Sequence, residues 1–140
     1  MTTAEALADA ASAPWRSVGY WMAALIVVLM AVNAVRAFAD PAGFATYLGL
    51  PLTDPKDTGF VNVYGLRAAF LGLFAAILLI QQDLNALKWF ALAAVIMPIG
   101  DAYLVSNAGA PTSTFVRHVA IAIYLVATFY MLHRWTGRTA

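Results

Sequence analysis

Residues 89–105 read WFALAAVIMPIGDAYLV, an apolar run that contains one charged residue, Asp101. With its flanking residues, the run approaches the roughly 20 apolar residues that a helix needs to cross a bilayer core. A second apolar run, Ala68–Ile80, begins directly after Arg67. Ionisable side chains are costly in hydrocarbon and, within a span, mark a functional site whose partner has to be named. The two runs predict membrane-crossing helices that carry opposite charges.

The composition supports the same class. Of the 140 residues, 63% are hydrophobic and 11% are charged, which is typical of an integral membrane protein. The chain is long enough for one domain, and four spans leave no room for a soluble one. We expect an all-α fold, an antiparallel four-helix transmembrane bundle, with spans near Val18–Val35, Val61–Ile80, Trp89–Val105 and Val119–Leu132.

Several classes of function are excluded or disfavoured by composition. The net charge is +1 and no basic stripe is present, so no nucleic-acid partner is expected. The chain has no cysteine, which excludes thiolate catalysis and thiolate metal sites. One histidine and one carboxylate fall short of the usual three or four metal ligands, so we predict no metal and no cofactor.

The predicted organisation is a polar leader over residues 1–14, a single four-helix transmembrane domain over 15–136 and a tail over 137–140. A cleaved signal peptide is the alternative for the first span. Glu5 and Asp9 with no cation before Arg16 argue against it, as does the length of the apolar run. We therefore expect the first span to be a retained helix.

Local signals predict two caps, a short helix and a kink. Asp40-Pro41 is typical of an N-cap followed by proline at the first helical position, which predicts a short interfacial helix over 41–48, between spans one and two. Asp83 is the expected cap of the third span. Pro98 lies inside that span and removes a backbone hydrogen bond, so a kink is expected there.

Four antiparallel spans place both termini on one side of the membrane, which we call the terminal side; the other is the loop side, with the 40–59 segment. The notable polar residues near the spans all fall on the loop side. They come from all four helices, which predicts one pocket beneath the 40–59 segment. These residues are Asn33, Arg36, Asn62, Tyr64, Arg67, Asp101, Tyr103, Arg117 and His118.

The charges also suggest an orientation. If the loop-side arginines belong to the pocket, the free cation of that side is Lys56, against Arg16, Lys88, Arg134 and Arg138 on the terminal side. The positive-inside rule then places both termini in the cytoplasm, in a cytoplasmic or inner membrane. The expected partners are the lipid bilayer, a lipophilic small molecule and a second copy in a homo-oligomer.

We predict that Arg67 and Asp101 form an ion pair, because each relieves the cost of burying the other. In an enzymatic interpretation Asp101 and His118 exchange protons, Arg67 stabilises developing negative charge and Tyr64 orients the substrate. Each of these assignments has a structural alternative. The Arg67–Asp101 pair could only fix helix packing, His118 could be hydrogen-bonded to a loop carbonyl, and Tyr64 could anchor its helix at the membrane interface.

The other candidate substrate-binding residues are Asn33, Arg36, Asn62 and Arg117. Asn33 and Arg36 could bind a carboxylate or phosphate; the alternative for Arg36 is that it extends to the headgroups. The function that these residues favour is binding or transformation of a small lipophilic molecule by acid–base chemistry, with enzymatic activity left open. The alternative is a structural or accessory subunit in which the Arg67–Asp101 pair only fixes helix packing.

The chain resembles the family called domain of unknown function 4267, small four-helix membrane proteins. The resemblance covers roughly residues 20–135 and rests on motifs that include a histidine near the fourth span, here His118. At Ala68 the family pattern often has an acidic residue, so a charge that the family uses is missing here. The resemblance implies a fold without an established activity. The motifs are Asp40-Pro41, Tyr47-Leu48-Gly49-Leu50-Pro51, Tyr64-Gly65-Leu66-Arg67 and Pro98-Ile99-Gly100-Asp101.

Overall fold

The computed structural model describes residues 13–54 and 56–139, and these are helical apart from turns and short connections. Most of the predicted leader, residues 1–14, lies outside the described residues. The predicted tail is helical up to Thr139. The elements are η1 (Pro14–Arg16), α2 (Val18–Ala39), α3 (Pro41–Leu48), α4 (Gly59–Ile80), α5 (Leu84–Ala94), α6 (Ile96–Asn107) and α7 (Thr112–Thr139).

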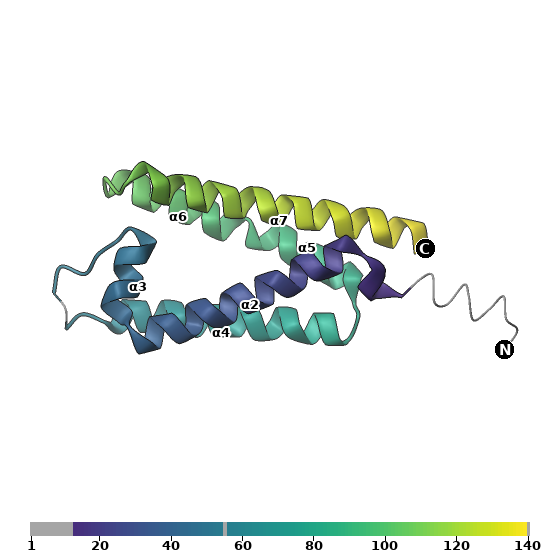
Figure 1. The fold of residues 1–140 in the computed structure, drawn as a ribbon, viewed down its shortest axis with the longest axis horizontal. Coiled ribbons are helices and arrows are strands. Elements are labelled where there is room, and N and C mark those ends of the chain that lie inside the picture. Colours follow the sequence, from purple (N-terminus) through teal and green to yellow (C-terminus); the bar gives the residue numbers. More distant parts are fainter. Residues whose placement is uncertain (1–12, 55, 140) are drawn as a thin grey trace, which may run out of the picture.

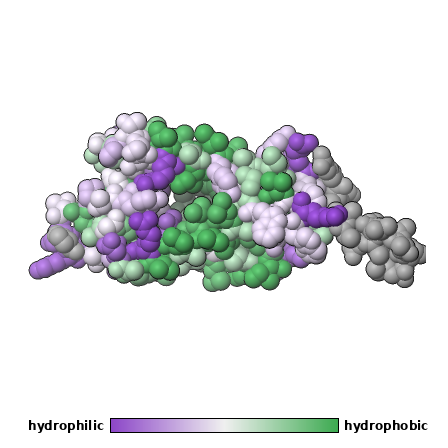
Figure 2. All heavy atoms as spheres, viewed as in Figure 1, coloured by the Kyte–Doolittle hydropathy of each residue, from purple (hydrophilic) through white to green (hydrophobic). Residues whose placement is uncertain are grey.

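Within the described residues, four helical segments are long and apolar enough to cross a membrane: α2, α4, α5 with α6, and α7. The start of α2 and the end of α7 lie at the same end of the molecule, as antiparallel spans require (Figure 1). Figure 2 shows a hydrophobic belt across the middle of the molecule, with hydrophilic residues gathered toward its two ends. The predicted all-α, four-helix transmembrane fold is confirmed, and the chain is a membrane protein.

The predicted interfacial helix is confirmed as α3, and its local chemistry explains its bounds. The Asp40 side chain accepts a hydrogen bond from the Gly43 backbone N–H at 2.9 Å, and Pro41 supplies a first helical position that needs no donor. Gly49 ends the helix with a φ of 89°, a left-handed conformation that glycine adopts without a steric penalty.

The third span is divided into α5 and α6 at Val95. Pro98 has no N–H to donate to the Ala94 carbonyl, so the hydrogen-bond ladder is interrupted at this turn. The third span is thus interrupted within one turn of Pro98, near the position where the sequence predicts a kink. Asp83 caps α5 by accepting a hydrogen bond from the Ala86 N–H at 2.9 Å, also as predicted.

The helices form two pairs, α2 with α4 and α6 with α7, which are joined at the terminal side. A buried cluster there links α2, α4, α5 and α7. It consists of Ala23, Ala75, Leu78, Leu79, Leu84, Leu87 and Leu132. Close approach of α2 to α7 depends on Gly19, because a Cβ at that position would lie 2.8 Å from the Leu132 backbone nitrogen. The Tyr124 hydroxyl of α7 also donates to the Met22 carbonyl of α2 at 3.1 Å.

On the loop side the two pairs separate, and contacts between α4 and α6 are few among the described residues. Helix α3 lies between the pairs at this end (Figure 1). Phe44 of α3 is buried in a cluster with Ala37 of α2 and Val61 of α4. On the other flank Gly49 packs so closely on α7 that a Cβ there would lie 2.6 Å from the Thr114 side chain. The short helix thus connects two helix pairs that otherwise diverge.

Candidate functional site

The charged centre of the loop side is formed by Asp101 of α6 and His118 of α7. The His118 Nδ1 lies 3.8 Å from a carboxylate oxygen of Asp101, and the exposed fractions of the two side chains are 5% and 30%. The other imidazole nitrogen, Nε2, is buried and has no hydrogen-bond partner among the described residues. One ring nitrogen of His118 therefore lies near a carboxylate, and the other has no hydrogen-bond partner in the described part of the chain.

The predicted ion pair between Arg67 and Asp101 is wrong. Among the described residues the ion pair within 4 Å is that of Asp101 with His118, and Arg67 is exposed on α4. The reason is that the helix pairs diverge on the loop side. Helix α6 packs along α7 and makes few contacts with α4, so the ion-pair partner of Asp101 comes from α7. The alternative in which an Arg67–Asp101 pair fixes packing falls with it.

Helical periodicity relates Arg67 and Asp101 to a contact that α4 makes with α5. Nearer the terminal side, Phe74 of α4 contacts Phe90 of α5, with ring centroids 5.6 Å apart. Arg67 precedes Phe74, and Asp101 follows Phe90, by close to whole numbers of helical turns. Val95 keeps helical backbone angles, φ −59° and ψ −28°, so this periodicity continues through the break. Both charges thus extend the Phe74–Phe90 face toward the loop side, where the helices have separated.

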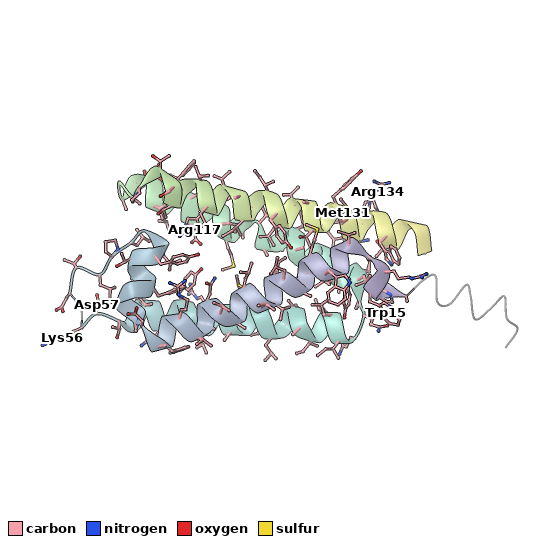
Figure 3. All side chains as sticks on the ribbon, viewed as in Figure 1. Trp15, Lys56, Asp57, Arg117, Met131 and Arg134 are labelled. Atoms are coloured by element: carbon pink, nitrogen blue, oxygen red, sulfur yellow. The ribbon has the colours of Figure 1, made fainter. Side chains whose placement is uncertain are left out.

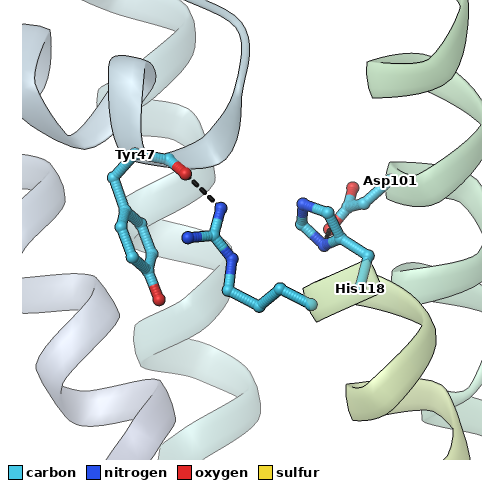
Figure 4. Close-up of polar contacts among 4 residues, drawn as sticks. Tyr47, Asp101 and His118 are labelled. Carbon is cyan, nitrogen blue, oxygen red and sulfur yellow. Dashed lines mark hydrogen bonds and ion pairs between the residues drawn. The ribbon is translucent and has the colours of Figure 1, made fainter. Parts of the chain in front are cut away.

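Tyr47 of α3 binds two arginines. The Arg117 guanidinium carbon lies 3.9 Å from the Tyr47 ring centroid and that of Arg36 lies 4.3 Å from it. Arg117 also donates a hydrogen bond to the Tyr47 carbonyl oxygen. Figure 3 shows the Arg117 side chain in the space between α7 and α3, and Figure 4 shows Tyr47 on one side of this contact with Asp101 and His118 on the other. Helices α2, α3 and α7 therefore contribute to one cationic group beside the histidine.

Tyr64 joins the same region from α4. It is half-buried, its ring centroid lies 5.6 Å from that of Phe44, and its hydroxyl is close enough to Asp101 and Tyr47 to interact with both electrostatically. Of the residues that the sequence predicts as its site partners, Asp101 is thus within electrostatic range of Tyr64.

The two asparagines are placed differently. Asn33 is half-buried on α2. Asn62 is half-buried on α4 but points about 200° away from Tyr64, since each residue advances a helix by about 100°. Neither side chain makes a hydrogen bond within residues 13–54 and 56–139. Asn62 therefore lies on another face of α4 than Tyr64, and the role of Asn33 in binding stays a prediction.

Sequence reasoning missed the part that Phe44 and Tyr47 play. Their spacing of three residues puts both rings on one face of α3, and the structure stacks them at 6.1 Å with planes 22° apart. Tyr47 follows a capped helix start and lies among small and apolar residues, a pattern that suggests only an interfacial aromatic. Its two arginine partners come from distant segments, so the local pattern carried no signal of them.

A second feature lies on another flank of the α6–α7 pair. It is an apolar groove of about 410 Å³ that includes neither Asp101 nor His118 and is lined by residues of α6 and α7, among them Pro98, Tyr103, Phe115 and Ile123. In the described part of the chain, no group of three or more His, Cys, Asp or Glu side chains could hold a metal ion. The polar group around His118 is therefore the candidate site.

Comparison with known proteins gives one match. The family described as "Domain of unknown function (DUF4267)" matches residues 24–132, which include α2 from Ala24, all of α3 to α6 and α7 to Leu132. No curated protein and no solved structure matches the chain.

Proposed function

The chain belongs to the DUF4267 family, and we propose that it binds a small lipophilic molecule on the loop side and transfers a proton to or from it. The candidate catalytic residues are His118 and Asp101, with Arg67 as a third charged group. The proposal rests on the site and not on the family, whose description states no activity.

One observation carries the proposal: a buried imidazole within a membrane-crossing helix has a carboxylate at one nitrogen and no partner at the other. Buried polar atoms almost always have a hydrogen-bond partner, so an unpaired one calls for an explanation, and a polar atom of a bound ligand would supply the partner. A histidine–carboxylate pair is also the arrangement that general bases use, because the carboxylate orients the ring and stabilises the imidazolium.

The proton step follows from this geometry. Nε2 takes a proton from an acidic O–H or C–H group of the ligand, whose bonding electrons stay on the ligand as a negative charge. Asp101 then stabilises the imidazolium at Nδ1, so that the pair as a whole becomes neutral while the ligand takes up the negative charge, in a medium where an isolated charge is costly. Returning the proton to another atom of the ligand completes an isomerisation without any further reactant.

Other loop-side groups support the same step. Tyr64 orients a polar atom of the ligand, and Arg67 of α4 stabilises the developing negative charge. Arg36, Arg117 and Asn33 bind the polar head of the ligand. Asn62, on the far flank of α4, contributes least.

The test is to purify the full chain in lipid nanodiscs, extract bound small molecules and identify them by mass spectrometry. We expect the wild type to retain a lipophilic compound that His118→Asn loses or carries in a different isomeric form. His133→Asn is the matched control, because His133 is an exposed histidine at the other end of α7. Deuterium exchange into the retained compound, in buffered heavy water, reports the proton transfer directly.

Two results would contradict the proposal. The first is wild-type protein that carries no compound beyond bulk lipid. The second is a compound that is retained and exchanged equally by wild type, His118→Asn and His133→Asn. The second result would support binding of a compound but contradict the acid–base role of His118.

A structural or accessory subunit is the second candidate function. One observation favours it: Arg117 connects α7 to α3 through the Tyr47 carbonyl and ring, a contact that itself holds the two helix pairs. In that case substitutions at Asp101 and His118 lower the free energy of unfolding, and no compound is retained.

The orientation that we propose places both termini in the cytoplasm. Arg36 and Arg117 lie on Tyr47, which supports counting them with the site, so that the terminal side then has the larger number of free cations. Labelling of single cysteines introduced at Asp57 and near Arg134, with a reagent that does not cross membranes, tests this orientation in intact cells.

A further inference from the structure

We infer that Arg36, Tyr47 and Arg117 form an anion-binding site, which takes the carboxylate or phosphate head of a lipophilic molecule. The inference rests on the proposed function, since it names the chemical class of the ligand at that site. Carboxylate and phosphate share the chemistry concerned: a compact anion with several acceptor oxygens.

The first argument is the concentration of positive charge. Both guanidinium carbons lie within 4.3 Å of the same ring centroid, although the two arginines come from α2 and α7. Like charges held this close repel each other, and they do so most strongly where water is scarce. The Tyr47 ring offsets part of the repulsion through cation–π attraction. An anion that accepts hydrogen bonds from the free N–H groups of these arginines would offset the remainder.

The second argument is that neither arginine has a carboxylate partner in the described part of the chain. Three loop-side acidic residues have other partners: Asp40 caps α3, Asp54 accepts from the Lys56 N–H, and Asp101 pairs with His118. Arg117 donates one hydrogen bond to the Tyr47 carbonyl, and Arg36 makes no hydrogen bond within residues 13–54 and 56–139. A guanidinium carries five N–H donors in a fork that matches carboxylate and phosphate oxygens. Most of these donors are therefore free.

The third argument is position. The site lies under α3 at the loop-side end of the spans, where a ligand can keep its charged head at the interface and its tail among the helices (Figure 3). Asp101, beside His118, contributes one negative charge against the two positive charges of Arg36 and Arg117. The head of the ligand then meets a region of net positive charge. The reacting part of the ligand lies beside Nε2.

The test measures equilibrium binding to the full chain in phosphatidylcholine nanodiscs. The probes are radiolabelled oleate, a lipophilic carboxylate, and oleyl alcohol, its neutral counterpart. We expect oleate to bind more tightly than oleyl alcohol, and Arg36→Gln and Arg117→Gln each to weaken oleate binding about tenfold or more, since bonds to a charged guanidinium are among the stronger ones. Oleyl alcohol binding should not change.

The control variant is Lys56→Gln, which removes an exposed loop-side cation outside this group and should leave oleate affinity unchanged. Arg117 also connects α7 to α3, so Arg117→Gln removes a contact between helices as well as a charge. Unfolding midpoints are therefore recorded for all proteins, to separate a loss of stability from a loss of binding. Arg36→Gln decides the question if Arg117→Gln unfolds more easily. Adding phosphatidylglycerol to the nanodisc separates the sources of the anion: displacement of oleate identifies a lipid phosphate, and its absence identifies a free lipophilic carboxylate.

The outcomes separate the two proposals. If oleyl alcohol binds as tightly as oleate and the arginine variants change nothing, the anion site is wrong while the lipophilic site stands. If neither probe binds, both proposals fail. If His118→Asn binds oleate normally while the arginine variants do not, the anion site is supported independently of the proton step.

Discussion

The terminal half and the loop half of this bundle are held together in different ways. At the terminal side, apolar side chains of α2, α4, α5 and α7 interlock, and Gly19 allows the backbones of α2 and α7 to approach closely. On the loop side, the helix pairs separate, and a short helix with a polar contact to α7 lies between them. The ionisable groups of the candidate site belong to this second half.

The difference shows how a small membrane protein can accommodate charge. In lipid, helices associate mainly through van der Waals packing and polar contacts, because apolar burial adds little. Close packing at one end can hold the bundle, which leaves the other end free for groups that would weaken a packed core. We therefore expect stability to depend on the terminal half and ligand binding to depend on the loop half.

The largest effect on stability is expected for Leu132→Ala. Leu132 is fully buried in the terminal cluster, so its truncation leaves a cavity and should lower the free energy of unfolding by about 2–4 kcal/mol. The measurement is SDS-induced unfolding in mixed micelles, followed by circular dichroism. Leu73→Ala is the control, because Leu73 is 63% exposed on α4 and should change little. Equal losses of unfolding free energy for the two substitutions would contradict the prediction that stability depends on the terminal cluster.

Gly19→Ala should be next, with a loss of about 1–3 kcal/mol from overpacking. The new Cβ would lie 2.8 Å from a backbone nitrogen of Leu132, which cannot move without shifting α7. The matched variant is Gly100→Ala, where a Cβ meets nothing within 4 Å and alanine should be neutral or stabilising. If Gly19→Ala unfolds at the same detergent fraction as the wild type, α2 and α7 are not packed as described.

Asp40→Ala should cost about 1 kcal/mol, because it removes the N-cap of α3. The effect should be confined to the loop side. Hydrogen exchange should become faster for amides of residues 41–48 and stay unchanged in α5. Asp83→Ala, which removes the corresponding cap of α5, should give the reverse pattern. Faster exchange throughout the chain in Asp40→Ala would show that the two halves do not behave separately.

The smallest change in stability is expected for Asp101→Asn, within about 0.5 kcal/mol of zero. Replacing a charged partner inside the membrane removes both an attraction and a desolvation cost, and these terms largely cancel. The same SDS titration measures it, and retention of the bound compound measures the accompanying loss of function. A loss of stability as large as that of Leu132→Ala would favour the subunit interpretation over the chemical one.

Much of the fold could be predicted because its signals are local. The Asp40-Pro41 pair and Gly49 delimit α3, Asp83 caps α5, and Pro98 accounts for the break in the third span. Each of these depends on the backbone chemistry of neighbouring residues. The four apolar runs likewise predict four spans, since length and hydropathy alone decide whether a helix can cross a bilayer.

The candidate site was predictable only in part. Antiparallel topology correctly brings Tyr64, Asp101, Arg117 and His118 to the loop side. It does not predict that Asp101 pairs with His118 instead of Arg67, or that Arg36 and Arg117 share Tyr47. Such pairings depend on which helices diverge and on the rotation of each helix about its own axis.

By itself, the amino-acid sequence determined that this protein crosses the membrane four times, where α3 begins and ends, and which polar residues near the spans share the loop side. Only the tertiary structure decided which of those charges meet. The physical reason is range: caps, breaks and spans arise from interactions along one helix, whereas the partner of a side chain depends on packing between helices that are distant in sequence.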